Sequence, residues 1–304
     1  MVGEIVVVLV TLFITGTHSA SFTITNNCKY TIWPGILSNA GSSPLSSTGF
    51  SLQPSSSLSL NAPSTWSGRM WARTLCTTDS TTANNFTCQT GDCGSNKIEC
   101  LGGGAAPPAT LAEFTIQSGG LDFYDVSLVD GYNLPMLISI QGGSGNCSTT
   151  GCLVDLNEVC PSDLRVQGLD GKESVACKSA CEAFGSPQYC CSGAYGNPNT
   201  CKPTSYSQFF KNACPRAYSY AYDDATSTFT CSGADYVITF CPSIPNQKSQ
   251  GGGDHPEAVL PPLINDTMIF TGNPQDYSKA TPKQTTHMAT LIALTLGLSL
   301  WWLS

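Results

Sequence analysis

All sixteen cysteines of this chain lie between Cys28 and Cys241, and the segments before and after them contain none. An even number of thiols allows complete pairing, and cysteines this dense are typical of disulfide-bonded domains in oxidising compartments. Structural zinc is the competing explanation, but it usually needs CxxC pairs or histidines at set spacing. The three histidines, His18, His255 and His287, fall outside the cysteine-rich segment. The sequence therefore predicts one secreted domain with eight disulfides and no metal.

The two ends of the chain carry apolar segments typical of processing signals. Residues 5–15 form an apolar run too short to cross a bilayer comfortably, and small residues follow up to Ser19 and Ala20. This pattern predicts a signal peptide over residues 1–19 and a domain that begins at residue 20. Entry into the secretory pathway agrees with the disulfides expected from the cysteine content.

At the other end, residues 288–304 are apolar and finish the chain, with a polar spacer before them and small residues around Ser278. Small residues, a polar spacer and a short hydrophobic tail together predict a GPI-attachment signal, with Ser278 as the attachment site. A single membrane-spanning helix is the alternative, because about 20 apolar residues suffice to span a bilayer. Either interpretation attaches the protein to a membrane, and we favour the lipid anchor.

Between the domain and the tail, residues 242–287 are rich in Pro, Gly and Ser and contain no cysteine. This composition predicts a flexible stalk that holds the domain away from the membrane. Three Asn-X-Ser/Thr sequons predict N-glycosylation at Asn85, Asn146 and Asn265, of which Asn265 lies in the stalk.

Composition within the domain indicates a large apolar core and a mainly β structure. The formal net charge of the whole chain, -8, argues against nucleic acid as a partner, because nucleic-acid binding requires clustered Lys and Arg. Alternation of apolar and polar residues predicts strands, and 3.6-residue spacing predicts two helices, over residues 174–184 and 205–214. The predicted strands cover residues 21–26, 111–116, 123–130, 137–140 and 236–240. Cys28 and Cys241 follow the first and last of these strands, so a bridge between them would join the ends of the domain.

Several motifs appear together and in order along residues 20–241. They are Arg69-Met70-Trp71-Ala72-Arg73-Thr74, Cys88-Gln89-Thr90-Gly91-Asp92-Cys93 followed by Cys100, the run from Phe123 to Met136, and Tyr189-Cys190-Cys191. This set resembles the thaumatin-like proteins, the plant pathogenesis-related group five family. One departure is Asn84, where the family signature usually has glycine.

The resemblance implies a thaumatin-like flattened β-sandwich with two smaller disulfide-rich lobes and a cleft between the sandwich and the larger lobe. It also implies a pairing that spacing alone leaves open. The implied bridges are Cys28–Cys241, Cys76–Cys88, Cys93–Cys100, Cys147–Cys231, Cys152–Cys214, Cys160–Cys177, Cys181–Cys190 and Cys191–Cys201.

Carboxylates are the groups left for chemistry in this domain. Without a histidine between residues 20 and 241, Ser-His-Asp and Cys-His catalysis are excluded, and bridged cysteines are not nucleophiles. The resemblance implies a cleft in which one arginine lies among four carboxylates. The implied cleft residues are Arg69, Glu113, Asp125, Asp130 and Asp223, and the adjacent Asp224 is the alternative to Asp223.

Close carboxylates raise one another's pKa, so one stays protonated while another is ionised, as a glycosidase requires. By family analogy Glu113 is the general acid and Asp125 the base or nucleophile. Asp125 and Asp130 are an odd number of residues apart and would face opposite sides of an unbroken strand, so a bend between them is expected. The alternative for Glu113 is that it has no role in a cleft and simply lines a solvent-exposed face of the sheet.

The resemblance and the tail together predict a cell-surface plant defence protein, antifungal and monomeric, that binds β-1,3-glucan or another cell-wall polysaccharide through the cleft. It would lie on the extracellular face of the plasma membrane or in the apoplast, and no cofactor is expected. The alternatives are a weak endo-β-1,3-glucanase and a non-carbohydrate receptor or inhibitor of pathogen hydrolases, so whether it is an enzyme stays open. Aromatic candidates for sugar packing are Phe123, Tyr124, Tyr132, Phe210 and Tyr222.

Overall fold

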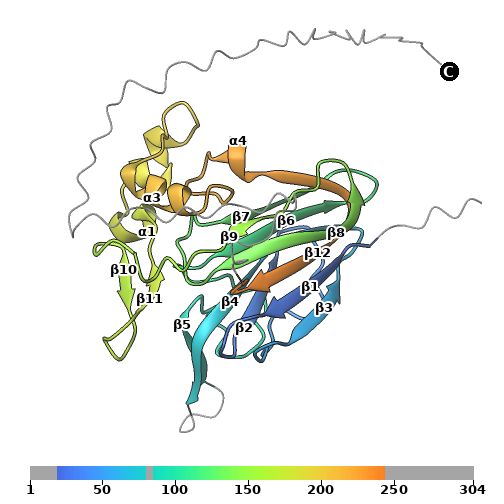
Figure 1. The fold of residues 1–304 in the computed structure, drawn as a ribbon, viewed down its shortest axis with the longest axis horizontal. Coiled ribbons are helices and arrows are strands. Elements are labelled where there is room, and N and C mark those ends of the chain that lie inside the picture. The colour runs from blue at the N-terminus through green and yellow to red at the C-terminus, as the bar shows by residue number, and fades with distance from the viewer. Residues whose placement is uncertain (1–18, 80–84, 244–304) are drawn as a thin grey trace, which may run out of the picture. The chain divides into compact units, whose positions relative to one another are not determined.

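The computed structural model describes residues 19–79 and 85–243, which form one β-rich unit (Figure 1). Within these ranges, the helices are too short or too polar to cross a membrane. The predictions for the signal peptide, the stalk, the hydrophobic tail, Asn265 and Ser278 lie outside the described residues, apart from the few residues at the edges of those segments.

The strands of the main sheet follow the order β2-β4-β6-β7-β12-β1-β3, with β5 paired to β4 and β8 lying between β12 and β9. The five predicted strands are confirmed, one with the predicted bounds and four with shifted ends. Within the described residues, the ten strands of this sheet are β1 Ser21–Asn26, β2 Trp33–Ser38, β3 Ser57–Asn61, β4 Thr65–Asp79, β5 Asn85–Thr90, β6 Leu111–Gln117, β7 Asp122–Ser127, β8 Met136–Ser144, β9 Thr150–Cys152 and β12 Phe229–Phe240.

The sheet curls into a sandwich because β12 is long enough to pair with strands of both layers. Its first residues pair with β7, and the remainder pairs with β8 on one edge and with β1 on the other. The layers meet through aromatic rings: Phe22 on β1 lies 5.2 Å from Trp66 on β4 and 4.8 Å from Phe114 on β6, measured between ring centroids. Burying an aromatic side chain stabilises the fold by about 2–3 kcal/mol. The predicted β-sandwich is therefore confirmed.

Strand β4 separates two cores because successive side chains point to opposite faces. Trp66, Met70 and Ala72 point into the sandwich, whereas Trp71 packs in a second cluster with Cys93, Cys100, Ala109 and Leu111. Gly35 lies opposite Trp71 in the register, and a Cβ there would come within 2.5 Å of the indole. The outer face of β4 is thus partly covered, and the uncovered remainder carries Arg69.

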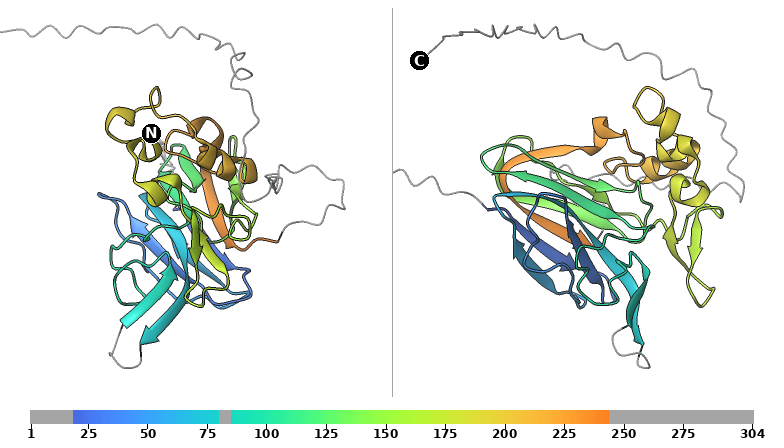
Figure 2. Two further views of the ribbon diagram at one scale, coloured as in Figure 1. Left: turned by 90° about the vertical axis from the view of Figure 1, so that its left-hand side faces the viewer. Right: turned by 180° about the vertical axis from the view of Figure 1, so that it is seen from behind.

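Helices and a small hairpin form the larger lobe beside one end of the sandwich (Figures 1 and 2). The expected helix over 205–214 is confirmed as α3 and is capped by Thr204. The remaining elements are β10 Arg165–Gln167, β11 Ser174–Cys177, α1 Ala180–Phe184, α2 Pro187–Cys190, the 3-10 turn η1 Gly193–Tyr195, α3 Ser205–Ala213 and α4 Asp224–Ser227.

The expected helix over 174–184 is wrong in its first half. Residues Ser174–Cys177 form β11, which pairs antiparallel with β10. The helix begins only after Ser179, whose hydroxyl accepts a hydrogen bond from the Glu182 backbone N–H. The periodicity misled because a four-residue strand and a five-residue helix adjoin in one window, and the strand depends on a partner elsewhere in the chain.

All eight disulfides implied by the resemblance are present, and no cysteine of the described residues is free. Cys28–Cys241 joins the two ends of the domain, across a sequence separation of 213 residues. Four bridges lie in or beside the larger lobe, namely Cys152–Cys214, Cys160–Cys177, Cys181–Cys190 and Cys191–Cys201. Of the predicted sequons, Asn85 begins β5 and Asn146 follows β8, and both side chains are exposed.

Candidate functional site

Three charged side chains stand in one row across the outer face of the sandwich. Arg69 on β4 lies directly opposite Glu113 on β6, and Glu113 lies directly opposite Asp125 on β7. Directly opposed residues share a face of the sheet, and adjacent strands lie about 4.8 Å apart. The alternating neighbours Ala112, Phe114 and Tyr124 point into the core, so the row faces away from it.

A turn after β7 brings Asp130 to the same cleft as Asp125. Strand β7 ends at Ser127, and the chain turns through Asp130 and Gly131. Gly131 has φ +84°, and a Cβ there would come within 2.7 Å of the Cys177 carbonyl oxygen. Both aspartates therefore line the cleft despite their odd spacing, because the strand does not continue between them.

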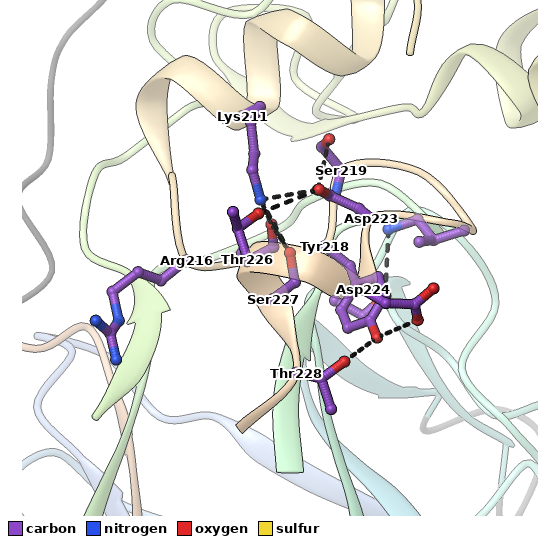
Figure 3. Close-up of polar contacts among 12 residues, drawn as sticks. Lys211, Arg216, Tyr218, Ser219, Asp223, Asp224, Thr226, Ser227 and Thr228 are labelled. Atoms are coloured by element: carbon purple, nitrogen blue, oxygen red, sulfur yellow. Dashed lines mark hydrogen bonds and ion pairs between the residues drawn. The ribbon is translucent and has the colours of Figure 1, made fainter. Parts of the chain in front are cut away.

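The facing wall comes from the segment between α3 and β12. The backbone of Tyr218 runs parallel to the end of β7: its N–H donates to Val126 O and its carbonyl accepts from the Leu128 N–H, each at 2.8 Å. The Tyr218 hydroxyl donates to Asp224 Oδ1 at 2.8 Å and also contacts the Thr228 hydroxyl (Figure 3). This network fixes Tyr218 and Asp224 on the cleft wall.

Asp223 and Asp224 point in different directions. Asp223 Oδ2 accepts from Lys211 Nζ at 2.9 Å and from the backbone N–H and hydroxyl of Ser219, both at 3.0 Å (Figure 3). Burial lowers the pKa of Lys211, and the Asp223 carboxylate partly opposes that shift. Of this adjacent pair, Asp224 is the residue that lines the cleft. Asp224, the alternative to Asp223 in the sequence-based prediction, is thus the residue that lies in the cleft. Asp223 lies behind the cleft wall, where it binds Lys211 and Ser219.

The cleft has a volume of about 380 Å³, within the range of small-molecule binding sites. Arg69, Glu113, Asp125, Asp130 and Asp224 supply its charges, and Leu111, Ser127, Val129, Tyr218 and Ala221 complete its lining. Tyr218 was not predicted from the sequence. Three of the predicted aromatic residues, Tyr124, Tyr132 and Phe210, belong to the core instead. An aromatic ring that packs into the core cannot be distinguished, from sequence alone, from one that faces a ligand.

The two carboxyl groups of the row, Glu113 and Asp125, both have raised pKa values but different charged neighbours. Burial raises the pKa of Glu113 and Asp130 adds to this, whereas the Arg69 guanidinium, 3.7 Å from Glu113 Oε1, opposes it. Burial, reinforced by the charges of Glu113 and Asp224, raises the pKa of Asp125 to about 8. Asp125 Oδ1 and Arg69 Nε are buried atoms without a hydrogen-bond partner in the described part of the chain.

This pKa predicts a pH-dependent stability. The pKa of Asp125 in the folded protein exceeds its ordinary value of 3.8, so between pH 4 and pH 8 the folded state binds more protons than the unfolded state. The contribution of Asp125 to the free energy of unfolding therefore decreases as the pH rises through this window. We expect Asp125→Asn to be more stable than wild type at pH 8, by at least about 1 kcal/mol, with little difference at pH 4. Urea unfolding at the two pH values measures this.

The matched control is Asp170→Asn, which removes one carboxylate from an exposed turn away from the cleft. This variant should differ from wild type by about the same amount at both pH values. An Asp125→Asn protein that is less stable than wild type at pH 8 would contradict the prediction.

The sequence matches the Thaumatin family over residues 26–242. It is 62% identical over 241 residues to Thaumatin-like protein 1 of Arabidopsis thaliana, covering 77% of this chain and 90% of that protein. It is 55% identical over 229 residues to the glucan endo-1,3-beta-glucosidase of Prunus avium, covering 75% and 92%.

Among solved structures, a laminaripentaose-producing beta-1,3-glucanase in complex with laminaritetraose aligns with a TM-score of 0.50. The alignment covers 73% of this chain and 98% of that one at 13% sequence identity, so the likeness concerns the fold. Family match, high identity to thaumatin-like relatives, and the eight disulfides all agree. The chain belongs to the thaumatin family.

Proposed function

We propose that this protein binds β-1,3-glucan, or a related cell-wall polysaccharide, in the acidic cleft. The observation that carries the proposal is the row of Arg69, Glu113 and Asp125 on the floor of an open, polar cleft of about 380 Å³. Carboxylates accept hydrogen bonds from sugar hydroxyls, and guanidinium and phenol groups donate to sugar oxygens. Tyr218 adds an aromatic ring to the wall.

The role follows from this binding. We place the protein in plant defence against fungi, as an extracellular, monomeric protein held at the plasma membrane by the predicted lipid anchor. Two observations support this: the relatives include plant thaumatin-like and pathogenesis-related proteins, and the sequence of residues 242–304 fits a stalk followed by an anchor signal.

Pull-down of residues 20–241 on insoluble β-1,3-glucan tests the proposal. Wild type and Asp170→Asn should bind, whereas Arg69→Met, which leaves Glu113 without its neighbouring cation, should bind at least about tenfold more weakly. Equal retention of all three proteins on cellulose would show that the binding is unspecific. Absence of binding by wild type would redirect the search to a protein ligand, such as a pathogen hydrolase.

Hydrolysis of the bound glucan is the second candidate function. It is favoured by two adjacent carboxyl groups, Glu113 and Asp125, whose pKa values are both raised, with a cation beside Glu113. We expect Glu113→Gln to lower the release of reducing ends by about 100-fold or more, because one of the two groups that move protons is lost. Reducing-sugar assays on laminarin measure this. A wild-type protein that binds but releases no reducing ends would reject the enzyme candidate.

A further inference from the structure

The charges of the cleft are ordered along the row. Arg69 stands at one end, beside Glu113. Asp125 is one strand farther away, so its backbone lies two strand spacings, about 10 Å, from that of Arg69. Of the described residues that line the cleft, only Arg69 is a cation. The positive charge is therefore positioned next to Glu113 and not next to Asp125.

The groups around Asp125 are negative or neutral. Glu113 faces Asp125 from β6, and Asp224 and the Tyr218 hydroxyl face Asp125 from the wall segment. Two further charged groups of the cleft lie farther off: Asp130 is on the turn after β7, and Arg69 is on the far side of Glu113. Asp125 Oδ1 is buried and has no hydrogen-bond partner in the described structure. An ionised Asp125 would thus place negative charge on a buried oxygen among like charges, which is costly. The protonated, neutral acid avoids this cost.

Asp224 is fixed in its position opposite Asp125. Its Oδ1 accepts from the Tyr218 hydroxyl, and the Tyr218 backbone is bonded to the end of β7, the strand that carries Asp125. Behind the wall, Lys211 binds Asp223 and also donates to Ala217 O and Ser227 Oγ, near the two ends of the segment (Figure 3). The negative charge of Asp224 is therefore held near Asp125 by the lobe.

We infer that Asp125, rather than Glu113, is the carboxyl group that carries a proton in the cleft and donates it in a hydrogen bond to an oxygen of the bound sugar. Asp224 is a positioning residue that keeps this proton on Asp125, and Glu113, beside Arg69, is the ionised acceptor. This reverses the roles expected from the resemblance. For its ligand, the inference rests on the proposed binding of glucan.

The same order applies to the hydrolytic candidate. There, Asp125 transfers its proton to the glycosidic oxygen while the bond from that oxygen to C1 breaks. Water supplies the oxygen that bonds to C1, and Glu113 takes up the proton that this water loses. Exchange of one proton each with solvent then restores both carboxyl groups.

Binding of laminarin oligosaccharides at pH 6 and pH 9 tests the inference. With a pKa of about 8, wild-type Asp125 is about one-tenth protonated at pH 9, so Kd should rise about tenfold between the two pH values. Asp125→Asn has an amide that donates at every pH, so its ratio of Kd values should be near one. Asp170→Asn, outside the cleft, should keep the wild-type ratio. A wild-type ratio near one, or a tenfold ratio that persists in Asp125→Asn, would overturn the inference.

A second measurement reads the proton directly and does not require a ligand. Carbon-13 NMR of the side-chain carboxyl carbons, with the Asp125 signal assigned by its loss in Asp125→Asn, should show a titration midpoint near pH 8. In Asp224→Asn that midpoint should fall by about one pH unit or more. An Asp125 midpoint below pH 5, or one unchanged in Asp224→Asn, would refute the assignment. If wild type binds no glucan at any pH, the proposed function fails, while the NMR titration still decides which carboxyl carries the proton.

Discussion

Replacement of Arg73 by methionine is expected to lower the free energy of unfolding by about 4 kcal/mol. Arg73 is 1% exposed, and its guanidinium donates to the carbonyls of Trp33 at 2.9 Å, Pro34 at 3.2 Å and Ile98. Methionine retains most of the apolar volume but removes the guanidinium donors from these partly or fully buried carbonyls. The Pro34 carbonyl keeps the Phe50 N–H as a donor, whereas each buried acceptor left unpaired costs about 1–3 kcal/mol. Urea unfolding followed by tryptophan fluorescence measures the change.

Arg73→Lys separates the charge from the shape of the guanidinium. Lysine retains the positive charge but cannot reach three carbonyls in one plane, so we expect an intermediate loss of stability. The guanidinium also lies over the Phe86 ring at 5.3 Å, which lysine would reproduce only in part. A loss below about 1 kcal/mol in Arg73→Met would show that water replaces the missing donor.

Replacement of Lys211 by methionine is expected to have the second largest effect, because it acts on both stability and the cleft. The Lys211–Asp223 pair is mostly buried, with 24% and 11% of the two side chains exposed. Removing the cation leaves the Asp223 carboxylate without its charge partner, which we expect to cost about 3 kcal/mol. The wall segment should then move, so that Kd for glucan rises at least about tenfold. Thermal unfolding and oligosaccharide binding measure the two effects.

The matched control for this prediction is the double variant Lys211→Met with Asp223→Asn. It removes both charges, so the amide retains hydrogen bonds with Ser219 and Thr226 without a buried unpaired charge. We expect it to recover at least about half of the stability lost in the single variant. If the double variant were less stable than Lys211→Met alone, the loss would come from packing and not from the unpaired carboxylate.

Local pattern identified the strands whose side chains alternate strictly. β1 has the bounds that alternation predicts, and β6 extends its predicted range by one residue, because each has one face in the core and one outside. The segment around Ser174 was misassigned because β11 exists only through its pairing with β10. The order of the motifs led to the eight bridges through the resemblance. The resemblance implied a fold, and the fold determines which cysteines lie close enough to pair.

The site shows the same division at the level of single residues. Charged residues at 69, 113 and 125 could be proposed from the motifs, yet their alignment on neighbouring strands depends on the register of β4, β6 and β7. The choice between Asp223 and Asp224 could not be made from adjacent identical residues. It was decided by Lys211, which binds Asp223 on the far side of the wall.

By itself, the sequence determined a disulfide-bonded, mainly β domain of the thaumatin type, because cysteine density, alternation and motif order are properties of the chain alone. The tertiary structure decided which carboxyl group of the row lies beside a cation and which lies among negative and neutral groups. That difference arises from segments far apart in the sequence: Arg69 lies 3.7 Å from Glu113, and the charge of Asp224 acts on Asp125 across the cleft. Burial and neighbouring charge set the protonation of a side chain, and both are fixed only when the chain has folded.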